Sequence, residues 1–407
     1  MTNTPLDDPN ILRRSDFLLP KGTIYMDGNS LGPSSLASNK ATQDVLNNQW
    51  EQDLIKSWNV HSWIDLPKKV GSKIAPILGA APDQVIACDS ISVNLFKLLS
   101  AGLKINDERK IIVSEQKNFP TDLYIAQGLS ELLGKDKCEL KQVEKHEIED
   151  ALNDEVAILM LTHVDFRTGE MLSMERITKL AHQHGVLVLW DLAHSAGAVP
   201  LELDRWNVDF AVGCGYKYLN GGPGSPAFMY VSKRHLRHLK QPLTGWMGHA
   251  SPFSFEPEYS PAEGIEKALC GTPPILSFAA LDGALNAFEG LDMMQVRAQS
   301  NSLKLHFLAT VTEILQTNPD LKLVTPEDEE RQGSQLSFSH PHSYAIAQAL
   351  IDKQIIVDFR APDILRLGFT PLYLSHAEVE KAAKTLRNIV QDGSYLNAKY
   401  QTRNKVT

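Results

Sequence analysis

The fold of this chain is decided by the stretch LVLWDLAHSAGAVPLELDRWNVDFAVGCGYKYLNGGPG, residues 187–224. Its first apolar run ends at Asp191, and a second apolar run, residues 210–212, leads through a glycine-flanked cysteine to Lys217. Apolar runs with polar boundaries are typical of strands buried on both faces of a parallel sheet. An acid therefore follows one predicted strand and an amine follows the next, at the edge where open α/β sheets bind ligands.

The pairing of Asp191 with Lys217 suggests pyridoxal 5'-phosphate as the cofactor. A lysine amine bonds covalently to the cofactor's aldehyde, and a carboxylate keeps its pyridine nitrogen protonated so that the ring accepts electrons. The alternative is an aspartate that caps a helix and a surface lysine in a turn. The glycine-rich turn after Lys217 favours the cofactor interpretation over this alternative.

Seven short apolar runs between residues 83 and 231 predict strands, with helical stretches between most of them. These runs are 85–88, 110–114, 139–143, 156–162, 186–190, 209–213 and 227–231. Such alternation predicts an α/β fold, with a mostly parallel seven-stranded sheet flanked by helices. The last run follows Lys217 too closely for a helical crossover, so we expect that strand to be antiparallel.

We expect three parts along the chain. Residues 1–50 form an N-terminal arm and helices, residues 51–291 a large cofactor-binding domain, and residues 292–407 a smaller α+β domain. A helix is predicted from residue 35 to about residue 56. Its apolar residues are expected on one side: Leu36, Val45, Leu46, Trp50, Leu54 and Ile55.

Composition excludes several classes of function. The net charge of −9 gives no basic excess for binding nucleic acid phosphates. No apolar run approaches the roughly 20 residues of a membrane-spanning helix, and the N-terminus has no signal-peptide core. The four cysteines lie far apart with no CxxC pair, which is typical of reduced thiols in a cytoplasmic protein. His182 and His184 have a spacing seen in metal sites, but we expect them at the surface and predict no metal.

Seven further motifs carry a resemblance to a known family. They are DGNSLGP at 27–33, SVNLFKLL at 92–99, FPTD at 119–122, HVDFRTG at 163–169, GWMGH at 245–249, GTPPIL at 271–276 and LRLGFTPLY at 365–373. With DLAHSAG and GYKYLNGGPG, they resemble the fold-type-I pyridoxal phosphate enzymes of the class V aminotransferase group. Within that group the chain resembles the kynureninases most closely, over nearly its whole length. This resemblance implies a homodimer whose active sites are shared between subunits.

The resemblance also implies a set of cofactor-binding residues. They are Ile91, Ser92, Phe119, Pro120, Thr121, Asp122, Thr168, Asp191, His194, Tyr216, Lys217, Trp246 and Thr272. Ile91 and Ser92 would hold the phosphate, as a strand-to-helix turn allows, and Phe119 would stack on the ring. Trp246 and Thr272 would reach the phosphate from the second subunit. Plainer alternatives stay open: Ser92 as a helix N-cap, Asp122 as part of a helix start, and His194 as a core histidine.

The implied reaction is the hydrolytic cleavage of the Cβ–Cγ bond of kynurenine or 3-hydroxykynurenine, giving anthranilate or 3-hydroxyanthranilate and alanine. Lys217 would move the α-proton, Asp191 would keep the ring charged, and Tyr216 would protonate the β-carbon. A guanidinium suits the substrate α-carboxylate, and Arg366 is expected in that role with Arg360 structural. Trp58, Asn29 and Ser30 would line the aryl end of the substrate pocket.

Two rival functions remain open at this stage. Another class V enzyme, an aminotransferase or a cysteine desulfurase, would have a similar fold, and a desulfurase requires a mobile reactive cysteine. Cys270 is the one cysteine expected near the site. A non-catalytic dimeric scaffold is disfavoured because Lys217, Asp191 and Arg366 are all present.

Overall fold

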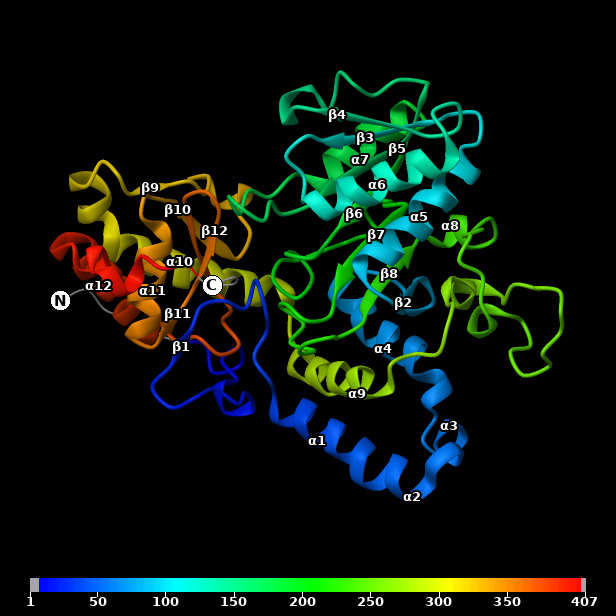
Figure 1. The fold of residues 1–407 in the computed structure, drawn as a ribbon, viewed down its shortest axis with the longest axis horizontal. Coiled ribbons are helices and arrows are strands. Elements are labelled where there is room, and N and C mark those ends of the chain that lie inside the picture. The colour runs from blue at the N-terminus through cyan, green and yellow to red at the C-terminus, as the bar shows by residue number, and fades with distance from the viewer. Residues whose placement is uncertain (1–6, 404–407) are drawn as a thin grey trace.

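The computed structural model describes residues 7–403, and residues 1–6 and 404–407 lie outside the described part. Its larger body is built on a seven-stranded sheet, with strand order β2-β8-β7-β6-β5-β3-β4 (Figure 1). The strands are β2 Val85–Ala87, β3 Ile111–Glu115, β4 Glu139–Val143, β5 Val156–Thr162, β6 Leu187–Asp191, β7 Phe210–Cys214 and β8 Ala227–Val231. The predicted α/β class and the seven predicted strands are confirmed, with boundaries that shift by at most one residue.

Strand direction follows the lengths of the connections. β4, β3, β5, β6 and β7 pair in parallel, whereas β8 is antiparallel to both β7 and β2. The chain between β7 and β8 contains Lys217 and is too short for a crossover helix, as the sequence indicated. In register, Thr162 of β5 lies beside Asp191 of β6, which lies beside Val212 of β7. The carboxyl ends of three strands therefore meet at one edge.

Helices cover both faces of the sheet. They are α4 Leu66–Ile74, α5 Ile91–Ile105, α6 Pro120–Leu133, α7 Met174–Gln183, α8 Lys233–Leu236 and α9 Ile275–Ala284. The core alternates along the strands: Val188 and Trp190 belong to one apolar cluster, and Leu189 between them belongs to the other. A strand buried on both faces in this way needs the continuous apolar run seen in its sequence.

The C-terminal part forms a second body, left of the large sheet in Figure 1. Its sheet has the order β12-β13-β10-β9, all antiparallel. The elements are α10 Met293–Thr317, β9 Lys322–Leu323, β10 Gln335–Ser339, α11 Ser343–Asp352, β12 Asp358–Arg360, β13 Ile364–Gly368 and α12 His376–Asp392. A parallel pair joins β1 Ile24–Tyr25 to β11 Ile355–Ile356, so the N-terminal arm is bound to this body. The three-part division of the chain stays a prediction.

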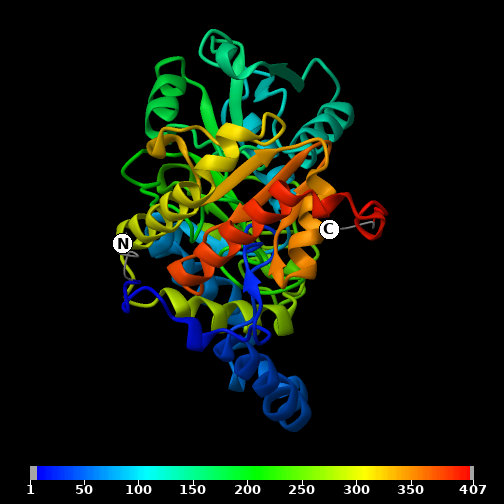
Figure 2. The same ribbon diagram turned by 90° about the vertical axis from the view of Figure 1, so that its left-hand side faces the viewer.

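The predicted helix at residues 35–56 is interrupted, and its apolar side is uncovered. It consists of α1 Leu36–Asp44, a π-helical turn at Val45–Trp50, the short α2 Glu51–Asp53 and a 3₁₀ turn, before α3 Ser57–Val60. The first part, α1, packs on α9, where Ser38 donates to the Ala280 carbonyl at 2.7 Å. Figures 1 and 2 show the far end of the segment, around α2, projecting from the molecule. Of its six apolar residues only Val45 is buried, while Leu54 and Ile55 are 62% and 78% exposed. The single helix expected over residues 35–56 is therefore not found, and five of its six apolar side chains are exposed in this chain.

Of the helices between residues 7 and 403, none combines the length and the apolar character that crossing a lipid bilayer requires.

Candidate active site

A cavity of about 320 Å³ lies at the carboxyl ends of β5, β6 and β7. It collects most of the predicted cofactor residues from four separate segments. The predicted residues that line it are Ile91, Ser92, Phe119, Thr121, Asp122, Asp191, His194, Tyr216 and Lys217. A topological edge of a parallel sheet is the usual place for such a site.

Asp191 and Asp122 form a buried carboxyl pair. Asp191 ends β6 and Asp122 lies in the first turn of α6. Burial raises the pKa of Asp122 well above its usual range, and the negative charge of Asp191 raises it further. Burial also raises the pKa of Asp191, but the charge of Lys217 and the backbone N–H of Ala193, 2.7 Å from Oδ1, oppose that rise. Of the two carboxyl groups, Asp122 is therefore the one whose surroundings favour the neutral form, and Asp191 is the one with groups that favour its charged form.

Lys217 lies in the tight turn between β7 and β8, facing the cavity. Burial lowers the pKa of its amine, and its Nζ lies 5.8 Å from the centroid of the Tyr216 ring. The arm packs directly against this turn, because the N–H of Gly32 donates to the Tyr216 carbonyl at 2.7 Å. A Cβ atom at Gly32 would lie 2.3 Å from the Lys217 carbonyl oxygen, so only glycine allows this approach.

The N-terminus of α5 forms the opposite wall. Ser90, not Ser92, is the N-cap, with its Oγ accepting from the N–H of Val93 at 3.3 Å. The alternative in which Ser92 caps the helix is therefore wrong, and Ser92 lines the cavity instead. Backbone N–H groups in the first turn of a helix have no intrahelical partner and attract anions. Ile91 and Ser92 are placed to meet a phosphate here.

Aromatic rings close the cavity. Phe119 precedes α6 and meets Phe166 edge to face, with ring centroids 5.2 Å apart, and both rings line the cavity. His194 also lines it, with Nδ1 3.2 Å from the side-chain oxygen of Gln335 in β10. Burial and the charge of Lys217 lower the pKa of His194 well below its usual range. The His194 ring is therefore neutral and links the large sheet to the smaller body.

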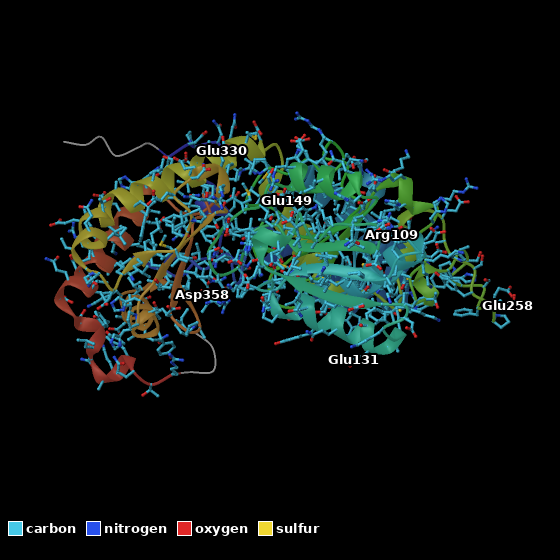
Figure 3. All side chains as sticks on the ribbon, turned by 90° about the horizontal axis from the view of Figure 1, so that it is seen from above. Arg109, Glu131, Glu149, Glu258, Glu330 and Asp358 are labelled. Carbon is cyan, nitrogen blue, oxygen red and sulfur yellow. The ribbon has the colours of Figure 1, made fainter. Side chains whose placement is uncertain are left out.

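Arg366 lies outside the set of residues that line the cavity and is only 1% exposed. Its Nε donates to Asp358 Oδ1 at 2.7 Å and its Nη2 to Asp358 Oδ2 at 2.5 Å. Nη2 also contacts Ser30 Oγ at 3.1 Å, and Nη1 donates to the carbonyl of Phe166. Figure 3 shows Asp358 on the strands of the smaller body. Arg366 can bind a substrate carboxylate end-on only by exchanging Ser30 or the Phe166 carbonyl for it.

Three predicted residues lie elsewhere in this chain. Trp58 packs edge to face on Trp63 at 6.0 Å, and Trp246 packs on Phe253 at 5.5 Å. Thr272 also lies outside the lining of the cavity. The expected role of Trp246 and Thr272 at the phosphate of a second subunit stays a prediction.

The remaining predicted residues lie outside the lining of the cavity. Pro120 begins α6, and Thr168 donates its hydroxyl to Asp165 Oδ1 at 2.9 Å. Asn29 is fully buried, and its side-chain amide has no hydrogen-bond partner among residues 7–403. Ser30 donates to Asp358 Oδ2 at 2.6 Å. Neither Asn29 nor Ser30 lines the cavity, and both lie beside the strand that contains Arg366.

Sequence reasoning missed three residues. Thr162 ends β5 and donates to Asn118 Oδ1 at 2.5 Å, Phe166 lines the cavity, and Asp358 pairs with Arg366. The polar end of the β5 run could have indicated Thr162, since it follows an apolar strand as Asp191 does. Asp358 had no comparable signal, because its partner is found only through the antiparallel register of β12 and β13.

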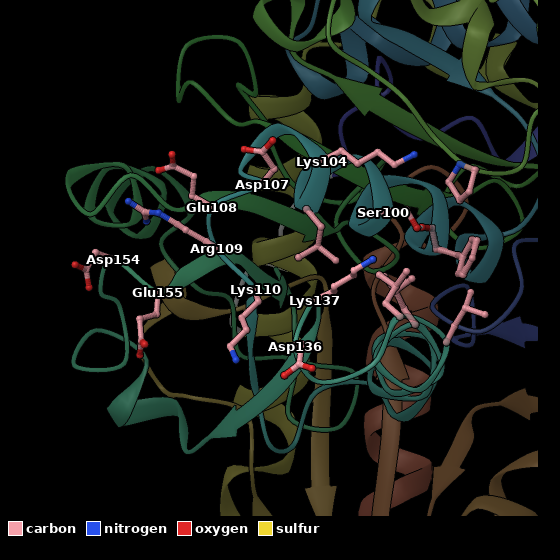
Figure 4. A pocket seen from close by; sticks show the side chains of 16 residues that line it. Ser100, Lys104, Asp107, Glu108, Arg109, Lys110, Asp136, Lys137, Asp154 and Glu155 are labelled. Carbon is pink, nitrogen blue, oxygen red and sulfur yellow. The ribbon is translucent and has the colours of Figure 1, made fainter.

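Two larger cavities lack this chemistry. One of about 690 Å³ lies between α5 and α6 at the opposite end of the sheet, where lysine and carboxylate side chains mix, such as Lys104, Lys137 and Asp136 (Figure 4). Because both positive and negative side chains lie on its rim, this cavity favours neither an anionic nor a cationic ligand. The other, about 860 Å³, is an open apolar hollow between the N-terminal arm and α9.

The residues of the smaller cavity fit pyridoxal 5'-phosphate. A helix N-terminus suits the phosphate, Phe119 offers a face to a flat ring, and Asp191 is a buried acceptor for a ring N–H. Lys217 brings an amine to the same space. Asp122 Oδ1 has no hydrogen-bond partner among the described residues, so a polar group is still missing there.

Comparisons of structure show the fold of this chain. An apo cysteine desulfurase from Thermococcus onnurineus NA1 superposes with a TM-score of 0.78 at 20% identity, covering 96% of this chain and 100% of the other. A mutant of the cystine lyase C-DES, with glycine covalently linked to its PLP cofactor, also superposes with a TM-score of 0.78. That match has 18% identity and covers 92% of this chain and 99% of the other.

Comparisons of sequence identify the family of this chain more narrowly than the comparisons of structure do. Residues 296–386 match the family model for the kynureninase C-terminal domain, and residues 68–202 match that of the DegT/DnrJ/EryC1/StrS aminotransferase family. The kynureninase of Pseudomonas fluorescens is 44% identical over 97% of this chain and 95% of its own length. The kynureninase of Burkholderia mallei is 48% identical over 98% of this chain and 97% of its own length. With this identity over almost its entire length, the chain belongs to the kynureninase family.

Proposed function

We propose that this protein is a kynureninase that uses pyridoxal 5'-phosphate. It adds water across the Cβ–Cγ bond of L-kynurenine or 3-hydroxykynurenine and releases L-alanine with anthranilate or 3-hydroxyanthranilate. The observation that carries the proposal is one cavity that contains Lys217, Asp191 and the N-terminus of α5. Family membership selects this reaction from those that such a cavity could support.

When bound, the cofactor supplies an electron-accepting ring and an aldehyde that bonds to amines. Asp191 would hold the ring nitrogen, Phe119 would cover one face, and Ile91 and Ser92 would meet the phosphate. Burial and the charge of Asp191 raise the pKa of Asp122, which favours its neutral form and so limits the negative charge beside the ring. The single charge of Asp191 therefore faces the nitrogen.

Lys217 is the group that moves the substrate's α-proton. An amine accepts a proton only when it is neutral, and burial lowers the pKa of Lys217 toward that state. The adjacent Tyr216 has a phenol whose pKa is raised by burial and by neighbouring negative groups. Tyr216 therefore stays protonated and is available to donate a proton to the β-carbon of the departing alanine.

The α-carboxylate of the substrate binds Arg366. The Asp358 carboxylate holds one side of the guanidinium, which leaves the end formed by Nη1 and Nη2 directed at Ser30 and the Phe166 carbonyl. A substrate carboxylate is a stronger acceptor than either of these groups, so it displaces them. Phe166 packs on Phe119, so this exchange takes place beside the ring that covers the cofactor.

A homodimer with shared sites completes each cavity. The projecting segment at residues 36–60 exposes Leu54, Ile55 and Val60, and the loop near residue 253 exposes Phe253 and Phe255. Adjoining apolar side chains on projecting segments are typical of an interface between subunits. Trp246 stacks on Phe253, and in the dimer it would reach the partner's phosphate together with Thr272.

We also infer that the enzyme works in the cytoplasm, where thiols stay reduced. Cys88, Cys138, Cys214 and Cys270 are all unpaired. Burial raises the pKa of the first three thiols, which keeps them unreactive. Cys270 is partly exposed but does not line the cavity, so no observation favours a cysteine desulfurase.

The test is incubation of the purified protein with pyridoxal 5'-phosphate and kynurenine, following anthranilate fluorescence. Parallel incubations with 3-hydroxykynurenine and with cysteine identify the preferred substrate. Release of alanine and sulfide from cysteine, without anthranilate from kynurenine, would contradict the proposal.

A further inference from the structure

Lys97 is a fully buried lysine beside the site, with a role that the reaction above does not use. It lies in α5, and its side chain has 0% exposure. Its Nζ donates to Asp89 Oδ2 and to the Ala268 carbonyl, each at 2.6 Å. A buried ammonium is tolerated only where such partners compensate for the lost water. Lys97 therefore joins two segments of chain from a fully buried position, although its partner Asp89 is partly exposed.

The first segment is the turn between β2 and α5. Asp89 has a left-handed backbone with φ +49°, which an aspartate adopts more readily than most residues. The Asp89 carbonyl accepts from the N–H of Ala227 in β8 at 2.9 Å. Strand β8 thus fixes the backbone of this residue and Lys97 fixes its side chain. The turn sets the direction of Ser90, Ile91 and Ser92, which all line the cavity.

The second segment runs from Ala268 to Thr272. The carbonyl of Cys270 accepts from the N–H of Met247 at 3.2 Å. Gly245 lies so close that a Cβ atom there would be 2.3 Å from the same carbonyl. The chain that contains Thr272 and the chain that contains Trp246 are therefore packed together, and Lys97 attaches both to the turn at Asp89.

Lys97 is not itself placed to bind the phosphate. Lys97 does not line the cavity, whereas Ile91 and Ser92 do. Long side chains on a helix point toward its N-terminus, and that direction brings the Nζ of Lys97 to Asp89.

We propose that Lys97 is a positioning residue for the cofactor phosphate. Its ammonium holds the Asp89 turn so that the first N–H groups of α5 converge, and it holds the segment that contains Thr272 against the same turn. The proposal rests on the proposed function only in taking pyridoxal 5'-phosphate as the cofactor.

The test compares the affinities of Lys97→Met apoenzyme for pyridoxal 5'-phosphate and for pyridoxal, which lacks the phosphate. Tryptophan fluorescence quenching gives both dissociation constants without turnover. We expect the dissociation constant for pyridoxal phosphate to rise about tenfold or more, which corresponds to the loss of a charge-assisted hydrogen bond. The dissociation constant for pyridoxal should stay within about twofold of the wild-type value.

Lys304→Met is the matched control. Lys304 is also buried, in α10, and its Nζ lies 2.6 Å from Gln332 Oε1, away from the cavity. This variant should leave both affinities unchanged. Lys97→Arg, which keeps the charge, should recover part of the lost affinity.

If the Lys97→Met variant does not fold, the Asp89→Asn variant tests the proposal in its place. Asparagine accepts the left-handed backbone but removes the charge that Lys97 pairs with. The same selective loss of pyridoxal phosphate affinity is expected. Equal weakening of both ligands, or unchanged affinity for pyridoxal phosphate in a folded variant, would overturn the proposal. A wild-type protein that binds no pyridoxal phosphate would instead refute the proposed function.

Discussion

The Asp358 carboxylate binds the Arg366 guanidinium side-on through two hydrogen bonds, with Nε 2.7 Å from Oδ1 and Nη2 2.5 Å from Oδ2. The two residues are cross-strand partners in β12 and β13. Such a two-point contact fixes the plane of the guanidinium as well as its charge. The other end of Arg366, which contacts Ser30 and the Phe166 carbonyl, is thereby oriented before the substrate arrives.

Replacing Arg366 by lysine should therefore weaken substrate binding. An ammonium cannot make the planar two-point contact, and we expect KM for kynurenine to rise roughly ten- to a hundredfold. Affinity for pyridoxal phosphate should not change. The control is Arg360→Lys, because Arg360 also contacts Asp358 at 2.9 Å but is partly exposed. A larger KM change for Arg360→Lys than for Arg366→Lys would reverse the assignment of the carboxylate-binding residue.

Borohydride reduction of the loaded enzyme should attach the cofactor to Lys217 and to no other lysine. Peptide mapping by mass spectrometry identifies the labelled residue. Lys217→Arg should lose the label and lower kcat by about three orders of magnitude, the upper range for removing a general base. A label on a different lysine of the unmodified enzyme would contradict the assigned site.

The two carboxyl groups of the buried pair should respond differently to the same substitution. Burial and the charge of Asp191 raise the pKa of Asp122 well above its usual range, which favours the neutral form of this carboxyl group. Asp122→Asn should therefore keep kcat within about tenfold, since an amide resembles a neutral acid in size and hydrogen bonding. Asp191→Asn removes the charge that faces the ring and should lower kcat by about a thousandfold or more. Steady-state kinetics at saturating cofactor measure both, and equal losses would show that Asp122 is charged.

The buried Asp209, far from the site, should make the free energy of unfolding depend on pH in acid. Asp209 lies 2.7 Å from both His182 and His235 and 2.6 Å from Arg234. Burial alone would raise the pKa of Asp209, but these partners outweigh it and lower the pKa below its ordinary 3.8. His182, expected at the surface, thus serves as a partner of this carboxylate.

A lowered carboxyl pKa stabilises the fold above the unfolded pKa, and that stability is lost as pH falls through the folded value. Asp209→Asn should cost about 2 kcal/mol at pH 7, less than a fully buried pair because Arg234 is partly exposed. Urea unfolding at pH 7 and below pH 3.8 measures this difference between variant and wild type. The difference should shrink in acid, and a constant difference would mean that Asp209 contributes through packing alone.

Charge on the projecting segment should separate the subunits. Ile55→Asp places a carboxylate on an exposed apolar surface, and we expect monomers in sedimentation velocity and weaker retention of the cofactor. Leu132→Asp is the control, because Leu132 is similarly exposed on α6 beside the cavity at the opposite end of the sheet. Dimers that persist in Ile55→Asp would place the interface elsewhere.

The sequence by itself determined the sheet and the two residues at its functional edge. Buried parallel strands need continuous apolar runs, and the first polar residue after each run lies at the common edge. Asp191 and Lys217 could therefore be located from residue order alone. The short connection after Lys217 likewise determined that β8 is antiparallel.

Only the tertiary structure decided which groups neutralise each other and which surfaces stay open. The pairing of Asp358 with Arg366, the raised pKa of Asp122 and the ion pair of Asp89 with Lys97 depend on contacts between distant segments. An apolar pattern such as that of residues 36–55 indicates that one side of the segment is to be buried, but it does not identify the element that buries it. The physical reason is that local periodicity specifies a residue's direction, whereas charge state and burial depend on neighbours that only the folded chain brings close.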